Sequence, residues 1–257
     1  FLEPSKWERE FRDLSIVDPL YYENKQLERI GMFLAEGGYE CISSEGLTGT
    51  GLSHGSGYQM RFIAERLKLL CPKAKIFIVI RNQAKALTSL YRDDIKYGYR
   101  MSCDNWLKQR FERSELGYFF YSKTIGLFRK IFGAKNVQVL AFEELFRIET
   151  LNKIYEFAGF PEDDFEYVDF GLKSNEGYSA TSVKIARVIN GFVNTKLTEG
   201  VTMYTAPRLQ CYNFFRYKFY PFLDRLLFTR WEKKNGGFRS EYLDDVFAGS
   251  FGADNVK

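Results

Sequence analysis

The sequence has few of the residues that most often bind metals. Its 257 residues include one histidine, His54, and four widely spaced cysteines, Cys41, Cys71, Cys103 and Cys211, with no C-x-x-C pair. A histidine-rich metal site is therefore excluded, and neither a zinc site nor a thioredoxin-type redox pair is indicated. We expect no bound metal, and we interpret the cysteines as buried free thiols of a reducing compartment.

Long apolar runs and a strong net charge are also lacking. The sequence has no signal-peptide pattern and no apolar span of about 20 residues, so we expect no membrane segment. We therefore expect a cytoplasmic protein, unless a signal or anchor precedes Phe1. The formal net charge of +4 suits an anionic cofactor but is too weak to indicate nucleic-acid binding.

The sequence does have a regular alternation of short apolar runs and helical stripes as far as about residue 160. This alternation predicts an α/β fold in which helices flank a central parallel sheet, and beyond Pro161 the pattern is mostly helical. We predict one domain over residues 1–257: a helical or irregular segment at 1–38, an α/β core at 39–160 and a mostly helical C-terminal part at 161–257. Strands are predicted at 39–44, 76–80 and 137–142. A helix is predicted from the end of the second strand to about Lys96, and further helices are predicted at 24–35, 58–70, 102–112, 118–132, 151–158, 178–193, 209–231 and 241–247.

Arg81 stands where the buried strand 76–80 ends and a helix begins. Open α/β sheets bind their ligands at the carboxyl ends of their strands. Ser89 follows eight residues later, about two turns along the helix at ~3.6 residues per turn. A cation at a strand end and a hydroxyl on the next helix can bind one phosphate together.

These residues resemble the 3'-phosphate-binding segment of sulfotransferases that use 3'-phosphoadenosine 5'-phosphosulfate (PAPS): Ile-Val-Ile-Arg-Asn, a serine eight residues after the arginine, and then a tyrosine. Further segments resemble the bacterial-type members of that family in the same order, so that the likeness extends from about residue 39 to about 190. These segments are 41–47, 63–67 with 72–75, 137–145, 157–160 and 173–175.

The resemblance implies a sulfotransferase domain of P-loop-like topology that transfers a sulfuryl group from PAPS to a hydroxyl, or as a second choice an amine, of a small molecule or glycan. It implies that Arg81 and Ser89 bind the 3'-phosphate. Lys173, Ser174 and Asn175 precede a predicted helix, where backbone amides and a lysine suit an anion, and in the family the corresponding loop closes over the same side of the nucleotide. The other interpretation of these three residues is an ordinary helix start with a Ser or Asn cap.

The reaction needs a base near the acceptor, because a neutral hydroxyl is a poor nucleophile. Some members of the family place a glutamate at the end of the second strand, where this sequence has Glu45. We rank Glu45 first and His54, in the following glycine-rich loop, second.

One feature of the family is missing. Its Gly-Thr-Thr-type loop after the first strand, which binds the 5'-phosphosulfate, does not occur in residues 1–257, and we expect it upstream of Phe1. The loop 46–53 matches the P-loop pattern except that Leu52 replaces the lysine that reaches the phosphates. Two alternatives therefore stay open: a P-loop-type nucleotide phosphotransferase, and a non-enzymatic relative that binds a nucleotide or polyanion.

Overall fold

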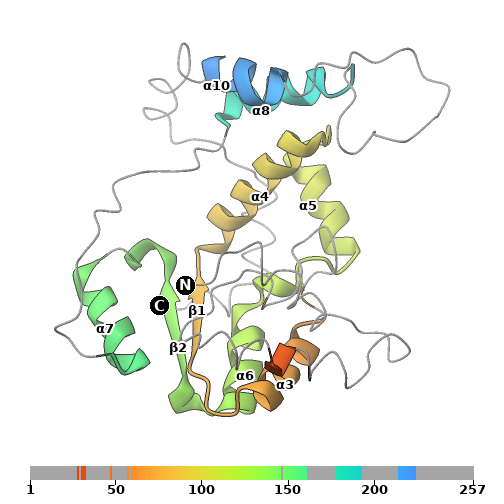
Figure 1. Ribbon diagram of the computed structural model, residues 1–257. Helices are drawn as coiled ribbons and strands as arrows, with labels where there is room; N and C mark the ends of the chain where they lie inside the picture. Colours follow the sequence, from red (N-terminus) through yellow and green to blue (C-terminus); the bar gives the residue numbers. More distant parts are fainter. Residues whose placement is uncertain are drawn as a thin grey trace. The chain divides into compact units, whose positions relative to one another are not determined.

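The computed structural model describes residues 28, 30–32, 47, 57, 59–145, 147–160, 178–192 and 214–223 (Figure 1). The chain divides into two compact units. Unit 1 comprises Phe1–Arg81, Arg110–Tyr167 and Val256–Lys257, and unit 2 comprises Asn82–Gln109 and Val168–Asn255. The single sulfotransferase-like domain stays a prediction.

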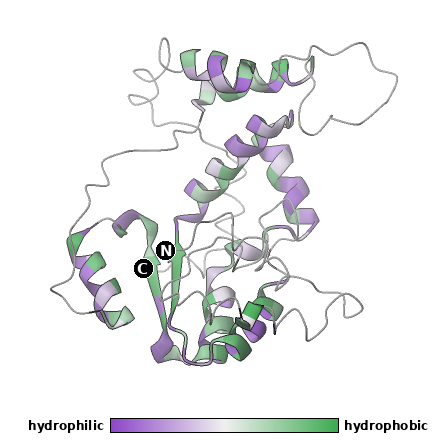
Figure 2. Cartoon of the chain, in the orientation of Figure 1, coloured by the Kyte–Doolittle hydropathy of each residue, from purple (hydrophilic) through white to green (hydrophobic). Residues whose placement is uncertain are grey.

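Unit 1 contains a parallel pair of strands, β1 (Ile76–Ile80) and β2 (Val137–Ala141). Their register runs from Ile76 opposite Val137 to Ile80 opposite Ala141. Both strands are mostly hydrophobic in Figure 2, as the apolar runs in the sequence predict. The described residues are thus mostly helical with a small parallel sheet, in keeping with an α/β fold. The wider sheet and its P-loop-like topology stay predictions, and the predicted strand 39–44 lies outside the described residues.

The described elements of unit 1 include the helices α3 (Met60–Leu70), α6 (Tyr121–Phe132) and α7 (Ile148–Ala158). Short 3-10 turns precede or follow them at Gly117–Phe119 (η3), Ala134–Asn136 (η4) and Phe142–Glu144 (η5). The helix α7 ends at Gly159, whose φ of 88° is in the left-handed region that glycine tolerates best.

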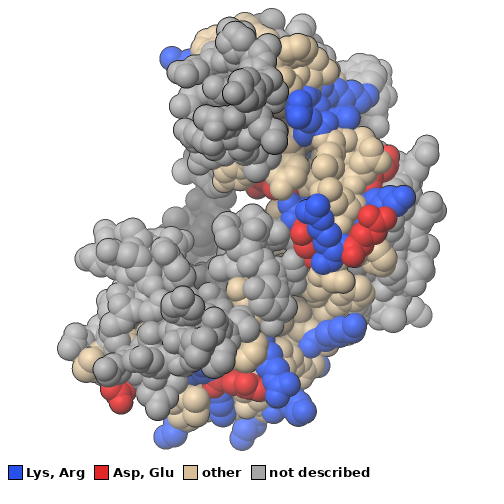
Figure 3. Space-filling model, turned by 90° about the vertical axis from the view of Figure 1, so that its right-hand side faces the viewer, with Lys and Arg blue, Asp and Glu red and all other residues tan. Residues whose placement is uncertain are grey.

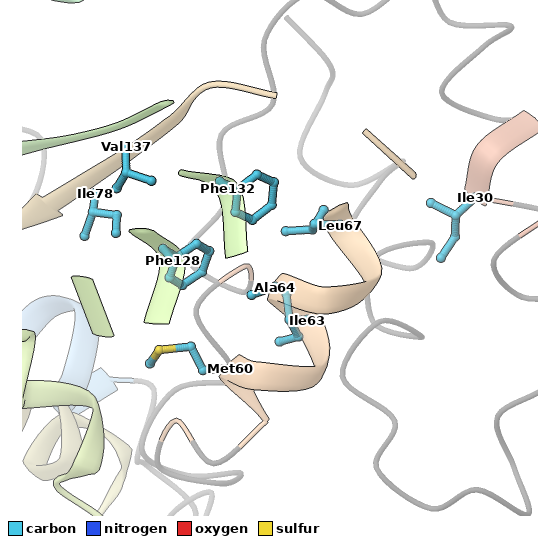
Figure 4. Close-up of a cluster of buried hydrophobic side chains, with 9 residues drawn as sticks. All are labelled: Ile30, Met60, Ile63, Ala64, Leu67, Ile78, Phe128, Phe132 and Val137. Carbon is cyan, nitrogen blue, oxygen red and sulfur yellow. The ribbon is translucent and has the colours of Figure 1, made fainter. Parts of the chain in front are cut away.

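The core of unit 1 lies between α3, α6 and the two strands. The apolar stripe of α3 buries Met60, Ile63, Ala64 and Leu67, because residues spaced three and four apart share one helix face. These side chains belong to one cluster with Phe128 and Phe132 of α6, with Ile78 and Val137 of the strands, and with Ile30 (Figure 4). The cluster holds α3 and α6 against the strands, and burying each large side chain contributes about 1.5–3 kcal/mol.

Unit 2 is helical in its described part. The helix α4 (Gln83–Tyr97) begins at Asn82, whose side-chain oxygen accepts a hydrogen bond from the Lys85 amide. Asn190, just after α8 (Ala180–Ile189), donates from its side chain to the carbonyls of Ile95 and Tyr99 at 2.9 and 3.0 Å. The helix α5 (Cys103–Glu112) begins in unit 2, and a π-helical turn, η7 (Phe215–Phe219), continues into α10 (Tyr220–Leu223). No helix in the described part of the chain is long and apolar enough to cross a membrane.

Candidate functional site

The carboxyl ends of β1 and β2 form the best-defined candidate site in unit 1. Because the strands are parallel and Ile80 lies opposite Ala141, the next residues, Arg81 and Phe142, emerge at the same edge of the sheet. The guanidinium carbon of Arg81 lies 5.0 Å from the centre of the Phe142 ring. This is a cation–π contact, and it holds the guanidinium beside the Phe142 ring.

The Nε atom of Arg81 is buried, and no described residue accepts its hydrogen bond. A buried donor without an acceptor costs about 1–3 kcal/mol, so such groups are uncommon in folded proteins. An acceptor of negative charge would form a charge-assisted bond with this donor. The strand end therefore has a donor suited to an anionic ligand.

Tyr121, the first residue of α6, lies beside Arg81. Burial raises the pKa of Tyr121 to about 12, and the backbone N–H of Arg81 partly offsets this effect by donating to the phenol oxygen. The hydroxyl consequently keeps its proton at neutral pH. It can accept from the Arg81 backbone and still donate to a ligand, so this edge combines a fixed cation with a neutral hydrogen-bond donor.

Sequence reasoning missed Tyr121 and Phe142 as site residues. Phe142 lies beside Arg81 because β2 pairs with β1 in the register that places Ala141 opposite Ile80, and the sequence alone specifies neither that pairing nor its register. Tyr121 gives no signal in the sequence either. Its role depends on how α6 packs against the strands, which sequence spacing does not specify.

Ser89 is exposed on α4 and belongs to unit 2, whereas Arg81 is the last residue of the first segment of unit 1. Joint phosphate binding by Arg81 and Ser89 therefore stays a prediction. The other predicted site residues lie outside the described residues: Glu45, His54, Lys173, Ser174 and Asn175. The loop 46–53 also lies outside them, apart from Leu47.

Two aromatic residues near Ser89 are part of the core of unit 2. Tyr91 is 0% exposed and donates from its hydroxyl to the Met101 carbonyl at 2.8 Å. Trp106 is 1% exposed and donates from Nε1 to Oδ2 of Asp94 at 2.7 Å. The two rings lie 5.5 Å apart. Because both side chains are buried, neither ring is exposed to stack on a ligand.

Unit 1 also has an open hollow of about 280 Å³ between the starts of α3 and α6. Of its two cations, Arg61 already pairs with Glu65 at 2.8 Å, and Lys123 is exposed to solvent. The hollow is therefore a weaker anion site than the Arg81 edge. Its lining includes Met60, Arg61, Ser114, Lys123, Thr124 and Leu127.

Within the described ranges, no group of three or more His, Cys, Asp or Glu side chains could hold a metal ion. The edge at Arg81 offers a different chemistry: hydrogen-bond donors and one positive charge.

No protein-family model matches this chain, and neither a curated protein sequence nor a solved structure matches it.

Proposed function

We propose that this protein is a sulfotransferase that transfers a sulfuryl group from PAPS to a hydroxyl acceptor. The observation that carries the proposal is Arg81, a cation at the carboxyl end of a parallel strand with a buried Nε that no described residue engages. A phosphate oxygen is the acceptor that best matches a fixed guanidinium. The resemblance of several segments to PAPS-dependent sulfotransferases then favours PAPS as the nucleotide.

The residues at this edge fit an anionic nucleotide. The Arg81 guanidinium carbon lies 5.0 Å from the centre of the Phe142 ring, and a guanidinium can still direct its N–H donors to a phosphate while it contacts an aromatic ring. Tyr121 holds the backbone of Arg81 through its phenol oxygen and is therefore a positioning residue. We assign the 3'-phosphate to Arg81, and the role expected for Ser89 rests on its spacing in the sequence alone.

PAPS supplies the sulfuryl group in this reaction. As the acceptor oxygen bonds to sulfur, the bond between sulfur and the 5'-phosphate oxygen breaks, and 3'-phosphoadenosine 5'-phosphate leaves. The acceptor proton passes to a base, for which Glu45 is the first choice and His54 the second. The chain's remaining contribution is positioning and stabilisation of charge, as in phosphoryl transfer.

The test compares nucleotide binding to Arg81→Ala and the parent protein by titration calorimetry. Loss of a charge-assisted contact to the 3'-phosphate should weaken binding of 3'-phosphoadenosine 5'-phosphate by about ten- to one-hundred-fold. Binding of adenosine 5'-phosphate, which lacks that phosphate, should change little. Arg129→Ala, on the exposed face of α6, is the matched control and should leave both affinities unchanged.

Equal losses for the two nucleotides would show that Arg81 does not bind the 3'-phosphate. Tight binding of ATP with no preference for a 3'-phosphate would favour the phosphotransferase alternative. A strongly salt-dependent affinity for polyanions, without sulfate transfer from PAPS, would favour the non-enzymatic one.

A further inference from the structure

The helical stretch 214–223, which consists of Phe214, η7 and α10, is aromatic on both of its faces. Tyr220 is buried at 3% exposure, and Phe215 and Phe219 are half-buried beside it. On the outer face, Phe214, Tyr217 and Phe222 are 54%, 62% and 55% exposed. A helix that is hydrophobic all round is normally covered on every side, so the outer face suggests a partner.

The inner face of the stretch 214–223, opposite the exposed rings, makes several contacts with other residues of unit 2. The Tyr178 hydroxyl donates to the Arg216 carbonyl at 2.9 Å, and the Tyr178 and Tyr220 rings lie 5.1 Å apart. The Arg216 guanidinium carbon lies 4.7 Å from the Tyr97 ring centre and 4.9 Å from that of Tyr217. These contacts fix the inner face of the stretch against the rest of unit 2, and the outer aromatic residues project from it.

The neighbouring helix α8 has a similar exposed face. Lys184, Val188 and Phe192 follow one another at intervals of four residues, and Val188 and Phe192 are 64% and 68% exposed. The opposite face of α8 buries Val183 and Ala186. Exposed apolar side chains therefore occur on α8 and on the stretch 214–223, which lie next to each other in Figure 1.

All charges on these two segments are positive. Residues 178–192 and 214–223 contain no Asp or Glu, and their charged residues are Lys184, Arg187, Arg216 and Lys218. The described atoms at the top of Figure 3, the level of α8 and α10 in Figure 1, likewise include Lys and Arg but no Asp or Glu. The occupant of the surface should accordingly be anionic as well as apolar.

We propose that α8 and the stretch 214–223 bind peripherally to an anionic lipid surface. Exposed Phe and Tyr side chains enter the boundary between headgroups and acyl chains, while Lys184 and Lys218 contact anionic headgroups. A second copy of this face would bring like charges together, which disfavours self-association. Nucleic-acid binding of useful strength needs more phosphate contacts than these few cations supply. The proposal is independent of the sulfotransferase assignment.

The test is sedimentation of the full chain with vesicles of phosphatidylcholine alone or of an equimolar mixture with phosphatidylglycerol. We expect binding to the mixed vesicles that weakens as salt is added, and little binding to the neutral ones. The double variant Phe214→Ala/Phe222→Ala should lower the partition coefficient about ten-fold or more. Lys218→Gln should lower it about five-fold on mixed vesicles only, and because this side chain is exposed the variant should fold normally.

The matched controls are Leu69→Ala, which removes a side chain 70% exposed on α3, and Lys130→Gln, on the exposed face of α6. Both should bind vesicles like the parent chain. Failure to bind the mixed vesicles would overturn the proposal, and so would equal losses in the control variants. The proposal would also be overturned if the chain did not bind vesicles and the variants of the stretch 214–223 instead abolished self-association or binding to single-stranded nucleic acid. Such a result would identify a different occupant.

Discussion

The effect of replacing Tyr91 by phenylalanine on the stability of unit 2 should change sign between neutral and alkaline pH. Tyr91 is fully buried, and its hydroxyl donates to the Met101 carbonyl at 2.8 Å. At neutral pH the variant loses this hydrogen bond. We expect it to be less stable than the parent chain by about 1 kcal/mol.

The alkaline range is different, because burial raises the pKa of Tyr91 from 10.0 to about 12. Between these values the folded chain retains a proton that the unfolded chain has lost, so this tyrosine's contribution to stability is complete below pH 10 and falls as pH rises towards about 12. At about 1.4 kcal/mol per pKa unit, the total loss is about 3 kcal/mol. Phenylalanine does not titrate, so the two stability curves should cross near about pH 11, and the variant should be the more stable at about pH 12.

The assay is urea unfolding at a series of pH values, with both proteins measured in the same buffers. The control is Ile95→Val, a buried aliphatic change in the same helix that should cost about 0.5–1.5 kcal/mol at every pH. A constant difference between Tyr91→Phe and the parent from neutral to alkaline pH would refute the reasoning. Affinity for 3'-phosphoadenosine 5'-phosphate should be unchanged in Tyr91→Phe, because this ring packs in the core and does not stack on a ligand.

Three further pairs of variants test the proposed chemistry and the packing. In a chain that transfers sulfate, Glu45→Gln should lower turnover by roughly two to four orders of magnitude at unchanged nucleotide affinity, and if His54→Ala gives that loss instead, the two roles are exchanged. Asp94→Ala removes the acceptor of the Trp106 indole N–H at 2.7 Å and should destabilise the chain to urea by about 1–3 kcal/mol, whereas exposed Asp93→Ala should change stability by less than about 1 kcal/mol. Gly159→Ala, at a φ of 88° with Nζ of Lys75 3.3 Å from the added carbon, should cost about 1–2 kcal/mol. Gly126→Ala lies in the middle of α6, where the added carbon would meet no atom within 4 Å apart from neighbouring backbone of the same helix, and it should stabilise the chain by about 0.5–1 kcal/mol. A higher melting temperature for Gly159→Ala than for Gly126→Ala would contradict this reasoning.

Much of the local structure could be predicted from the sequence, because hydrophobic periodicity dominates it. The apolar run 76–80 became β1 at its predicted bounds, and the stripe at 58–70 became α3 from Met60. The end of β1 at Arg81 was equally clear, since a polar residue follows five apolar ones. These features depend on neighbouring residues alone, which sequence patterns report well.

The arrangement around Arg81 could be predicted only in part. Its position at a strand end followed from the sequence, but the ring of Phe142 and the hydroxyl of Tyr121 come from segments about 40 to 60 residues away. The π-helical turn at Phe215–Phe219 was also missed, because an aromatic run has no periodicity that separates it from an ordinary helix. Tertiary packing decides such features, and one sequence contains little direct record of it.

The parallel pairing of β1 with β2 has a consequence for how the chain is made. Val137, the partner of Ile76, is synthesised roughly sixty residues later. At about 5–20 residues per second, the first strand leaves the ribosome roughly three to twelve seconds before the second one exists. During that interval the apolar segment Ile76–Ile80 lacks this hydrogen-bonded neighbour. Chaperones bind segments of this kind, and aggregation can start at them. Synthesis of residues 81–136 is therefore an interval in which β1 of a newborn chain needs protection.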